Sequence, residues 1–195
     1  MKDPLTAEDP ASTPLTPEER EALIPSYITQ RRELNEAEQI GIADADRWAF
    51  SRRRDVLSEE FLRGLHRRMF EGIWTWAGTF QTTPRNIGID AWEIGPQLRQ
   101  ILDDVRYWID HQTYAPDEIA VRFHHRLVWI HPFPNGNGRL SRLAADLLAV
   151  RLGRERFTWG SGNLVATADL RRQYVEALRA ADGQVIEPLV AFARS

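Results

Sequence analysis

The twelve residues from His131 to Arg142 constrain this chain more than any other segment. Their sequence is HPFPNGNGRLSR, in which two glycines flank Asn137. Glycine readily adopts positive φ angles, so such a turn can aim successive N–H groups at one point and form a concave anion site. The following residues, 139–151, contain few helix breakers. We therefore expect the turn to open a helix whose N-terminal dipole attracts an oligophosphate.

Two arginines and a histidine complete this candidate site. Arg139 and Arg142 are three residues apart, so on a helix they share one face, and their planar guanidinium groups can hold different phosphate oxygens. The imidazole of His131 is of a type that titrates near neutrality, which suits a general base. The pattern indicates phosphate binding next to a base.

The segment resembles the signature of the Fic (filamentation-induced-by-cAMP) family, which reads His-x-Phe-x-(Asp/Glu)-Gly-Asn-Gly-Arg-x-x-Arg. Every position matches except Asn135. The organisation is similar to that of the family from about Ser26 to Arg194, and the region 26–38 resembles the subgroup known as mobile mystery protein B. Most members of the family transfer AMP from ATP to a protein hydroxyl group, and the resemblance implies that activity here.

The resemblance also implies a role for each motif residue. His131 would be the catalytic base, which takes the proton from a Ser, Thr or Tyr hydroxyl of the target as the oxygen attacks the α-phosphorus. Phe133 would anchor the loop in the core. The nucleotide phosphates would be bound by Gly136, Asn137, Gly138, Arg139 and Arg142, with the two arginines on the β- and γ-phosphates. Such in-line transfer depends mainly on positioning and charge neutralisation.

Asn135 stands where the family usually carries an acidic residue that binds the metal ion. An amide oxygen is an uncharged ligand for Mg²⁺ or Mn²⁺, so we expect weak metal binding at this position. Two alternatives stay open. One is transfer of another phosphate-containing group, namely UMP, phosphocholine or phosphate, since the turn recognises phosphates and not the base. The other is a catalytically weak nucleotide-binding or interaction module of a toxin–antitoxin-like pair.

The region 27–50 is polar, with sparse apolar residues, and is interpreted as a helix resting on the domain. It contains the run Thr29-Gln-Arg-Arg-Glu33, which resembles the inhibitory pattern (Ser/Thr)-x-x-x-Glu-(Gly/Asn) of many Fic proteins. Leu34 departs from the last position of that pattern. By this resemblance Glu33 would pair with Arg142 and compete with the γ-phosphate of ATP. The alternative is a surface glutamate on a polar helix.

Residues 79–94 interrupt the helical pattern of the chain. They are enriched in threonine, isoleucine and aromatic residues around several turn formers, which predicts a short β-hairpin. In the Fic family a hairpin in this position is the flap that docks an extended segment of the target by strand addition. The resemblance assigns that docking role to Asn86, Ile87, Gly88 and Ile89. The alternative is an ordinary connecting loop.

Elsewhere apolar residues recur at helical spacing. Helices are predicted to begin at Ser58, Pro96, Pro116 and Thr167, the third running to Ile130. The sequence therefore predicts an all-α Fic fold with a short hairpin flap and an N-terminal inhibitory helix. We expect an extended arm over residues 1–25 and a Fic domain over 26–195.

The composition narrows the classes of function. The chain has 195 residues, a net charge of −3 and no cysteine, which disfavours nucleic-acid binding and excludes disulfides. No apolar run approaches the roughly 20 residues that span a bilayer, and the first residues lack a signal-peptide core, so a cytoplasmic location is expected. Lys2 is the only lysine among 25 basic residues, a bias typical of GC-rich bacterial genomes. The target, the preferred base and any homo-oligomer are left open.

Overall fold

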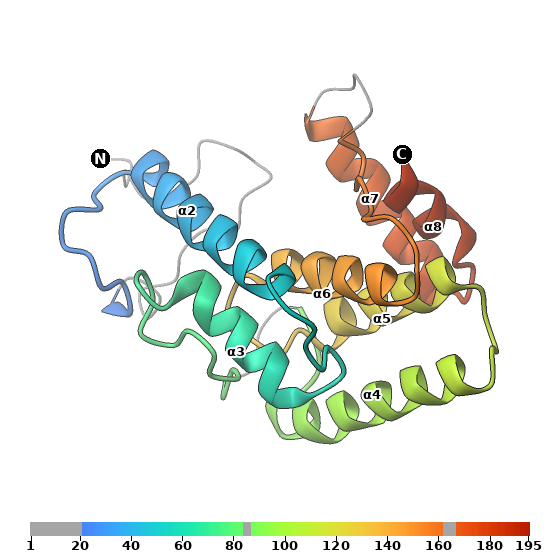
Figure 1. The fold of residues 1–195 in the computed structure, drawn as a ribbon. Helices are drawn as coiled ribbons and strands as arrows, with labels where there is room; N and C mark the ends of the chain where they lie inside the picture. Colours follow the sequence, from blue (N-terminus) through green and yellow to red (C-terminus); the bar gives the residue numbers. More distant parts are fainter. Residues whose placement is uncertain (1–20, 84–86, 162–166) are drawn as a thin grey trace. The chain divides into compact units, whose positions relative to one another are not determined.

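The computed structural model describes residues 21–83, 87–161 and 167–195, with only the backbone at Thr167 and Ala168. These ranges are mainly helical (Figure 1) and contain no strand beyond an isolated antiparallel bridge between Leu23 and Trp74, which confirms the predicted all-α class. The helices are α2 (Arg31–Phe50), α3 (Glu59–Phe70), the 3₁₀ turn η1 (Ala91–Glu93), α4 (Ile94–Asp110), α5 (Pro116–Ile130), α6 (Asn137–Arg151), α7 (Thr167–Asp182) and α8 (Glu187–Arg194). None of these described helices is long and apolar enough to cross a membrane.

The chain divides into two compact units. The first consists of the residues up to 54 together with 63–79, and the second of 55–62 together with 80–195, so the division falls within α3. Each unit has its own buried core. The residues of the candidate motif all belong to the second unit, whereas α2 belongs to the first.

In the first unit, a buried polar pair joins α2 to the segment after α3. The indole N–H of Trp74 donates a 3.0 Å hydrogen bond to the carboxylate of Glu38, and both side chains are buried. The backbone of the same segment pairs antiparallel with residues 22–24, where Ile24 N donates to Ile73 O at 2.8 Å. The partner satisfies part of the hydrogen-bonding capacity of a carboxylate that would otherwise be costly to bury.

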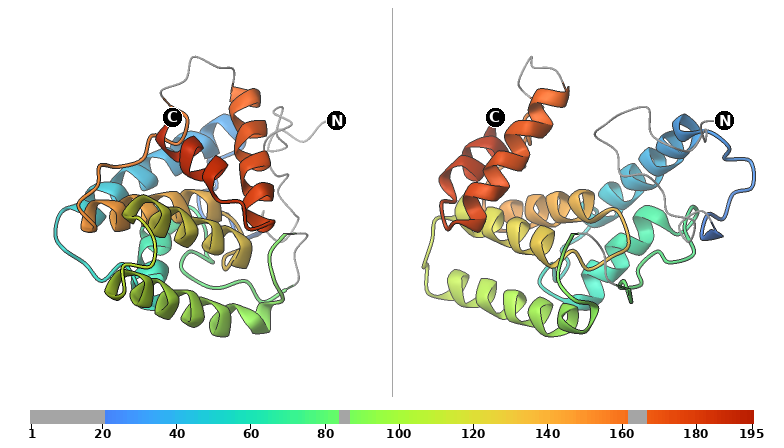
Figure 2. Two further views of the ribbon diagram at one scale, coloured as in Figure 1. Left: turned by 90° about the vertical axis from the view of Figure 1, so that its right-hand side faces the viewer. Right: turned by 180° about the vertical axis from the view of Figure 1, so that it is seen from behind.

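The second unit is built around α5 and α6, which pack against each other and carry the candidate motif between them (Figure 2). Helix α4 packs on α5, and α7 packs on α8, which also contacts α5. The apolar stripe of α5 is buried at Ile119, Phe123, Leu127 and Ile130, as its spacing predicts. Helix α6 is buried on most of its surface, as expected for a central helix.

The predicted helix starts agree closely with the structure. The hydroxyl of Ser58 accepts a 3.1 Å hydrogen bond from the N–H of Phe61 and so caps α3. Pro116 occupies the first turn of α5, where its missing N–H costs nothing. The short C-terminal helix α8 was not predicted, because eight residues are too few for a clear periodic pattern.

The predicted hairpin over residues 79–94 is not confirmed. Its described residues form no strand, and residues 91–93 form the 3₁₀ turn η1. The N–H of Gln81 donates to the carbonyl of Pro132 at 2.9 Å, so the first arm bonds to the loop between α5 and α6. Asn86, at the predicted turn, lies outside the described residues.

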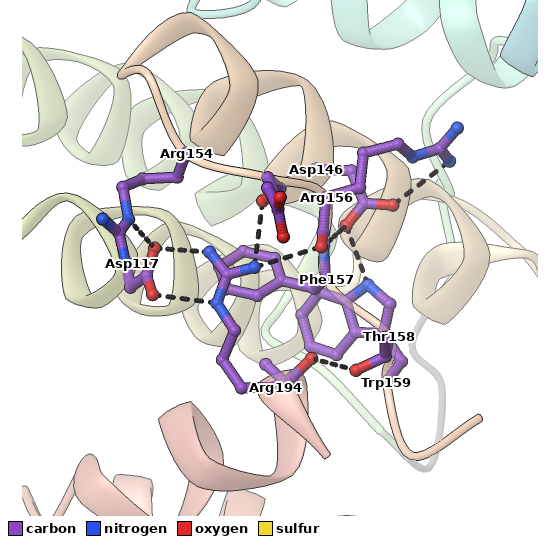
Figure 3. A network of polar contacts seen from close by, with 10 residues as sticks. Asp117, Asp146, Arg154, Arg156, Phe157, Thr158, Trp159 and Arg194 are labelled. Atoms are coloured by element: carbon purple, nitrogen blue, oxygen red, sulfur yellow. Dashed lines mark hydrogen bonds and ion pairs between the residues drawn. The ribbon is translucent and has the colours of Figure 1, made fainter. Parts of the chain in front are cut away.

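A network of charged groups ties the C-terminal helix to the start of α5 (Figure 3). The guanidinium of Arg194 donates to the carboxylate of Asp117, with Nε 2.8 Å from Oδ2, and Arg154 donates to the same carboxylate at 3.1 Å. The hydrogen bond from Arg194 is the main reason why the pKa of Asp117 is lowered. The ionised carboxylate of Asp117 therefore stabilises the folded state at pH values above the pKa of an unfolded aspartate. This stabilisation is lost as the pH falls through the lowered pKa of Asp117 in the folded protein.

Two glycines provide a test of the packing in the first unit. Gly41→Ala is expected to lower the free energy of unfolding by about 1–3 kcal/mol, because its Cβ would overlap the backbone carbonyl oxygen of Met69. Gly64→Ala, in α3, meets no atom within 4 Å and should stabilise the protein by up to about 1 kcal/mol. Urea denaturation of both variants measures the difference. A stabilised Gly41→Ala would show that α2 does not approach α3 at this point.

Candidate active site

The loop between α5 and α6 is closed by the side chain of Asn137. Its Oδ1 accepts a 3.0 Å hydrogen bond from Phe133 N, and its Nδ2 donates to Phe133 O at 2.7 Å. The Phe133 side chain is fully buried and lies 5.3 Å from the ring of Phe80, centroid to centroid. The burial of Phe133 is what we expect of a side chain that anchors the loop in the core. Because the side-chain amide of Asn137 bonds to Phe133, the group of this residue that can bind a nucleotide is its backbone N–H.

Gly136 makes the turn into α6 possible. Its φ of 79° lies in the left-handed region, which favours glycine. The carbonyl of Gly136 accepts hydrogen bonds from the N–H groups of Arg139 and Leu140, at 3.1 and 3.0 Å, so the helix begins at once. The first N–H groups of a helix have no intrahelical partner and carry partial positive charge. This helix start has the geometry that an anion site requires, and anion binding here stays a prediction.

Arg142 folds back over this helix start. Its Nε donates a 3.1 Å hydrogen bond to the carbonyl of Gly138, one turn earlier. One terminal nitrogen lies 4.0 Å from the point where a Cβ on residue 138 would stand. Helical side chains point toward the N-terminus, which makes this direction the natural one. The charge of Arg142 therefore lies over the first turn of α6, the same turn that contains Arg139.

His131 ends α5 in a left-handed conformation, with φ of 53°. Its N–H donates to the carbonyl of Leu127 at 3.1 Å, and its Nδ1 lies 3.4 Å from the carbonyl oxygen of Val128. A proton on Nδ1 that faces Val128 leaves Nε2 as the basic nitrogen. The carbonyl of His131 accepts a 3.0 Å hydrogen bond from the side chain of Gln81, which fixes the backbone of the base.

The segment assigned to target docking lies against the candidate base. Gly88 has φ of 100°, and a Cβ at this position would stand 2.5 Å from the Cβ of His131 and 3.1 Å from the carbonyl oxygen of Ile130. Only a residue without a side chain fits here without displacement. Ile87 beside it is exposed. The structure thus brings Gly88 next to His131, although no hairpin is formed by the described residues.

Glu33, the predicted inhibitory residue, caps its own helix. Its carboxylate accepts hydrogen bonds from the backbone N–H groups of Thr29 and Gln30, at 2.8 and 3.0 Å. These two bonds, that from Thr29 first, lower the pKa of Glu33. Glu33 lies in the first unit, and the bonds to Thr29 and Gln30 are those of a capping residue at the N-terminus of α2.

Sequence reasoning missed two residues of this region. Gln81 bonds to the motif loop through both its backbone and its side chain, and Tyr174 of α7 lies beside Arg142, whose Cζ is 5.7 Å from the ring centroid. Neither stands at a recognisable spacing from the motif. Their contacts arise from the tertiary fold, which no local pattern encodes.

The motif lies within a segment that matches the model of a known family. Residues 56–149 match the model of the Fic/DOC family. The chain is 28% identical over 150 residues to protein adenylyltransferase fic-1 of Caenorhabditis elegans, covering 73% of this chain and 27% of that protein. It therefore spans about a quarter of the length of this curated relative.

Solved structures show the same fold. Fic-1 from C. elegans superposes with a TM-score of 0.64 at 25% identity, covering 88% of this chain and 50% of that one. The VirB-translocated effector BepC from Bartonella tribocorum, with bound AMPPNP, superposes with a TM-score of 0.68 at 17% identity, covering 92% and 97%. The chain therefore shares the fold of these Fic-domain proteins, and the match of residues 56–149 to the Fic/DOC model confirms the resemblance seen in the motif. The mobile mystery protein B subgroup stays a prediction.

The donors present do not fit a firmly held Mg²⁺. The side chain of Asn135 carries no charge, and its Oδ1 accepts a 2.7 Å hydrogen bond from Gly136 N. Within the described ranges no group of three or more His, Asp or Glu side chains could hold a metal ion. A divalent ion at this site would depend chiefly on the phosphates of the nucleotide.

Asn135→Asp is expected to tighten Mn²⁺ binding in the presence of ATP by roughly tenfold, because a carboxylate restores a charged oxygen ligand. Titration followed by electron paramagnetic resonance gives the affinity. Asn35→Asp, on the exposed surface of α2, makes the same charge change elsewhere and is the control. Coincident titrations of Asn135→Asp and Asn35→Asp would show that residue 135 does not face the metal.

Proposed function

We propose that this protein transfers AMP from ATP to a hydroxyl group of a protein side chain and releases pyrophosphate. The observation that carries the proposal is the position of Arg142, folded over the open first turn of α6, with His131 at the other end of the same short loop. The name of the C. elegans relative, protein adenylyltransferase, supports the activity. The AMPPNP bound to the Bartonella effector supports an ATP-like donor.

In this proposal the phosphates lie at the start of α6. The backbone N–H groups of the first turn face the α- and β-phosphates, while Arg139 and Arg142 hold the β- and γ-phosphates. Donors that are already oriented stabilise the charge that accumulates on the departing pyrophosphate, since no reorganisation is needed during the reaction. The bond that breaks joins the α-phosphorus to the oxygen that bridges the α- and β-phosphates.

His131 acts on the other reactant. Its Nε2 takes the hydroxyl proton of the target as the oxygen attacks the α-phosphorus, so AMP becomes esterified to the side chain. The backbone around the base is fixed by the hydrogen bond from Gln81, and a fixed base lowers the entropic cost of reaching the transition state. No catalytic step is assigned to a metal ion.

The target would enter along residues 87–89. Gly88 lies against His131, so an extended chain bonded to this segment would present a hydroxyl close to the base. Strand addition of this kind uses backbone groups for affinity and side-chain pockets for selectivity. Ile87, Gly88 and Ile89 thus keep their proposed docking role, although the described residues of 79–94 form no hairpin.

A second candidate function is a nucleotide-binding module with little transfer activity, and the neutral Asn135 is the observation that favours it. Transfer of another phosphate-containing group is the alternative within enzymes, because the donors proposed for the site would bind the phosphates and not the base. Incubation with ATP labelled at the α- or the γ-phosphate separates these cases. Protein-bound α-label supports AMP transfer, γ-label supports phosphorylation, and ATP binding without either label supports the module.

His131→Ala is expected to lower α-label transfer at least about 100-fold while ATP affinity changes less than about twofold, because the base acts on the hydroxyl and not on the phosphates. Calorimetry measures the affinity. His125→Ala, which removes a neighbouring histidine bonded to Asp182, is the control and should transfer normally. A large loss of ATP affinity in His131→Ala would assign the imidazole to nucleotide binding instead.

We also propose that Glu33 restrains the activity by competing with the γ-phosphate for Arg142. Glu33→Gln removes the charge but keeps an oxygen that can cap α2, so it separates inhibition from helix capping. Glu33→Gln and Glu33→Gly should both raise automodification and increase the melting shift produced by ATP. Glu36→Gln, also exposed on α2, is the matched control. Equal automodification and equal shifts in all variants would leave Glu33 with only its capping role.

A further inference from the structure

Arg142 lies beside an aromatic ring and not beside an acid. Its Cζ is 5.7 Å from the centroid of the Tyr174 ring on α7, within the range of a cation–π interaction. Within the described part of the chain, no ion pair joins Arg142 to a carboxylate. A carboxylate would compete with a phosphate for the guanidinium donors, whereas a neutral ring can orient the cation and leave its charge available.

The ring of Tyr174 is itself held in place. Its hydroxyl lies 3.0 Å from Nε2 of His124, which is fully buried on α5. The ring of Trp159 packs 4.5 Å from His124, and the ring of Phe192 packs 5.5 Å from Tyr174, both measured between centroids. Tyr174 is therefore fixed by partners from α5 and α8.

The pair formed by His124 and Tyr174 is neutral. Burial, and after it the charge of Arg142, lowers the pKa of His124 to about 3. Burial raises the pKa of Tyr174 to about 12. Around neutral pH the imidazole is therefore uncharged and the phenol keeps its proton, so neither group repels or neutralises the guanidinium.

We propose that Tyr174, oriented by His124, is a positioning residue that holds the guanidinium of Arg142 over the start of α6 for the terminal phosphate of the nucleotide. The inference rests on the proposed function, in which Arg142 binds the γ-phosphate. Arg142 is then fixed at two points, the carbonyl of Gly138 and the ring of Tyr174. Preorganisation of this kind reduces the ordering cost when the phosphate binds.

The test compares ATP with AMP, because AMP lacks the phosphate that Arg142 would hold. Calorimetry on the full chain carrying Glu33→Gly, where Glu33 cannot compete, gives both affinities. Tyr174→Leu should weaken ATP binding by about tenfold and leave AMP binding within about twofold. Tyr174→Phe keeps the ring but loses the bond to His124, so the ratio of ATP to AMP affinity should fall about two- to threefold.

A second arginine–tyrosine contact offers the matched control. Arg122 lies 4.3 Å over the ring of Tyr114, so Tyr114→Leu removes a similar contact and should leave the ratio of affinities unchanged. An unchanged ratio in folded Tyr174→Leu overturns the inference. If that variant does not fold, an unchanged ratio in Tyr174→Phe does the same.

Arg142→Ala separates this inference from the proposed function. If it abolishes the preference for ATP over AMP while the Tyr174 variants keep it, Arg142 holds the phosphate without help from Tyr174, and only the positioning role fails. If Arg142→Ala also keeps the preference, the proposed phosphate contact fails, and the role of Tyr174 fails with it.

Discussion

The candidate site depends on two hydrogen bonds made by one buried amide. Asn137 closes the loop on Phe133 through its side-chain carbonyl oxygen and its N–H₂ group, because an amide carries both an acceptor for an N–H and a donor for a C=O. An aspartate at this position would direct a negative oxygen at a carbonyl. Because the loop is closed, Gly136 can turn in the left-handed region, α6 begins at Asn137, and its first N–H groups point to one side. The proposed anion site thus depends on a side chain that need not touch the ligand.

Around this loop, the parts of the proposed reaction are held by different kinds of contact. The guanidinium of Arg142 is oriented by the carbonyl of Gly138 in its own helix and by the ring of Tyr174. The backbone of His131 is instead held by a hydrogen bond from Gln81. The carboxylate of Glu33 accepts hydrogen bonds from the backbone N–H groups of Thr29 and Gln30. A carboxylate that stabilises a helix start and also restrains an active site would couple regulation to the folding of α2. Because of that coupling, a substitution of Glu33 that removes the charge but keeps the cap is needed to separate regulation from helix stability.

The sequence predicted local features well because local physics determines them. Ser58 and Pro116 mark helix starts, the stripe of α5 marks its buried face, and Gly136 marks the turn. The motif residues from His131 to Arg142 were recognisable as a group because they are adjacent in the chain. The positions of Gly88 against His131 and of Tyr174 beside Arg142 were not predictable, since they arise from tertiary packing over 43 and 32 residues of sequence, counted from the residue numbers. The hairpin expected from β-propensity is not formed by the described residues of 79–94, where Gln81 bonds to the motif loop and residues 91–93 form a 3₁₀ turn.

The order of the two helix ends has a consequence for the movement of charge. His131 stands at the C-terminus of α5, where the helix dipole places partial negative charge, and the anion site stands at the N-terminus of α6, where it places partial positive charge. In the proposed transfer, a proton arrives at the first end while negative charge accumulates at the second. Both displacements are favoured by the electric field of the two helix ends. A loop of six residues thus separates the negative end of α5 from the positive end of α6. The backbone therefore favours the proposed movement of charge independently of the side chains.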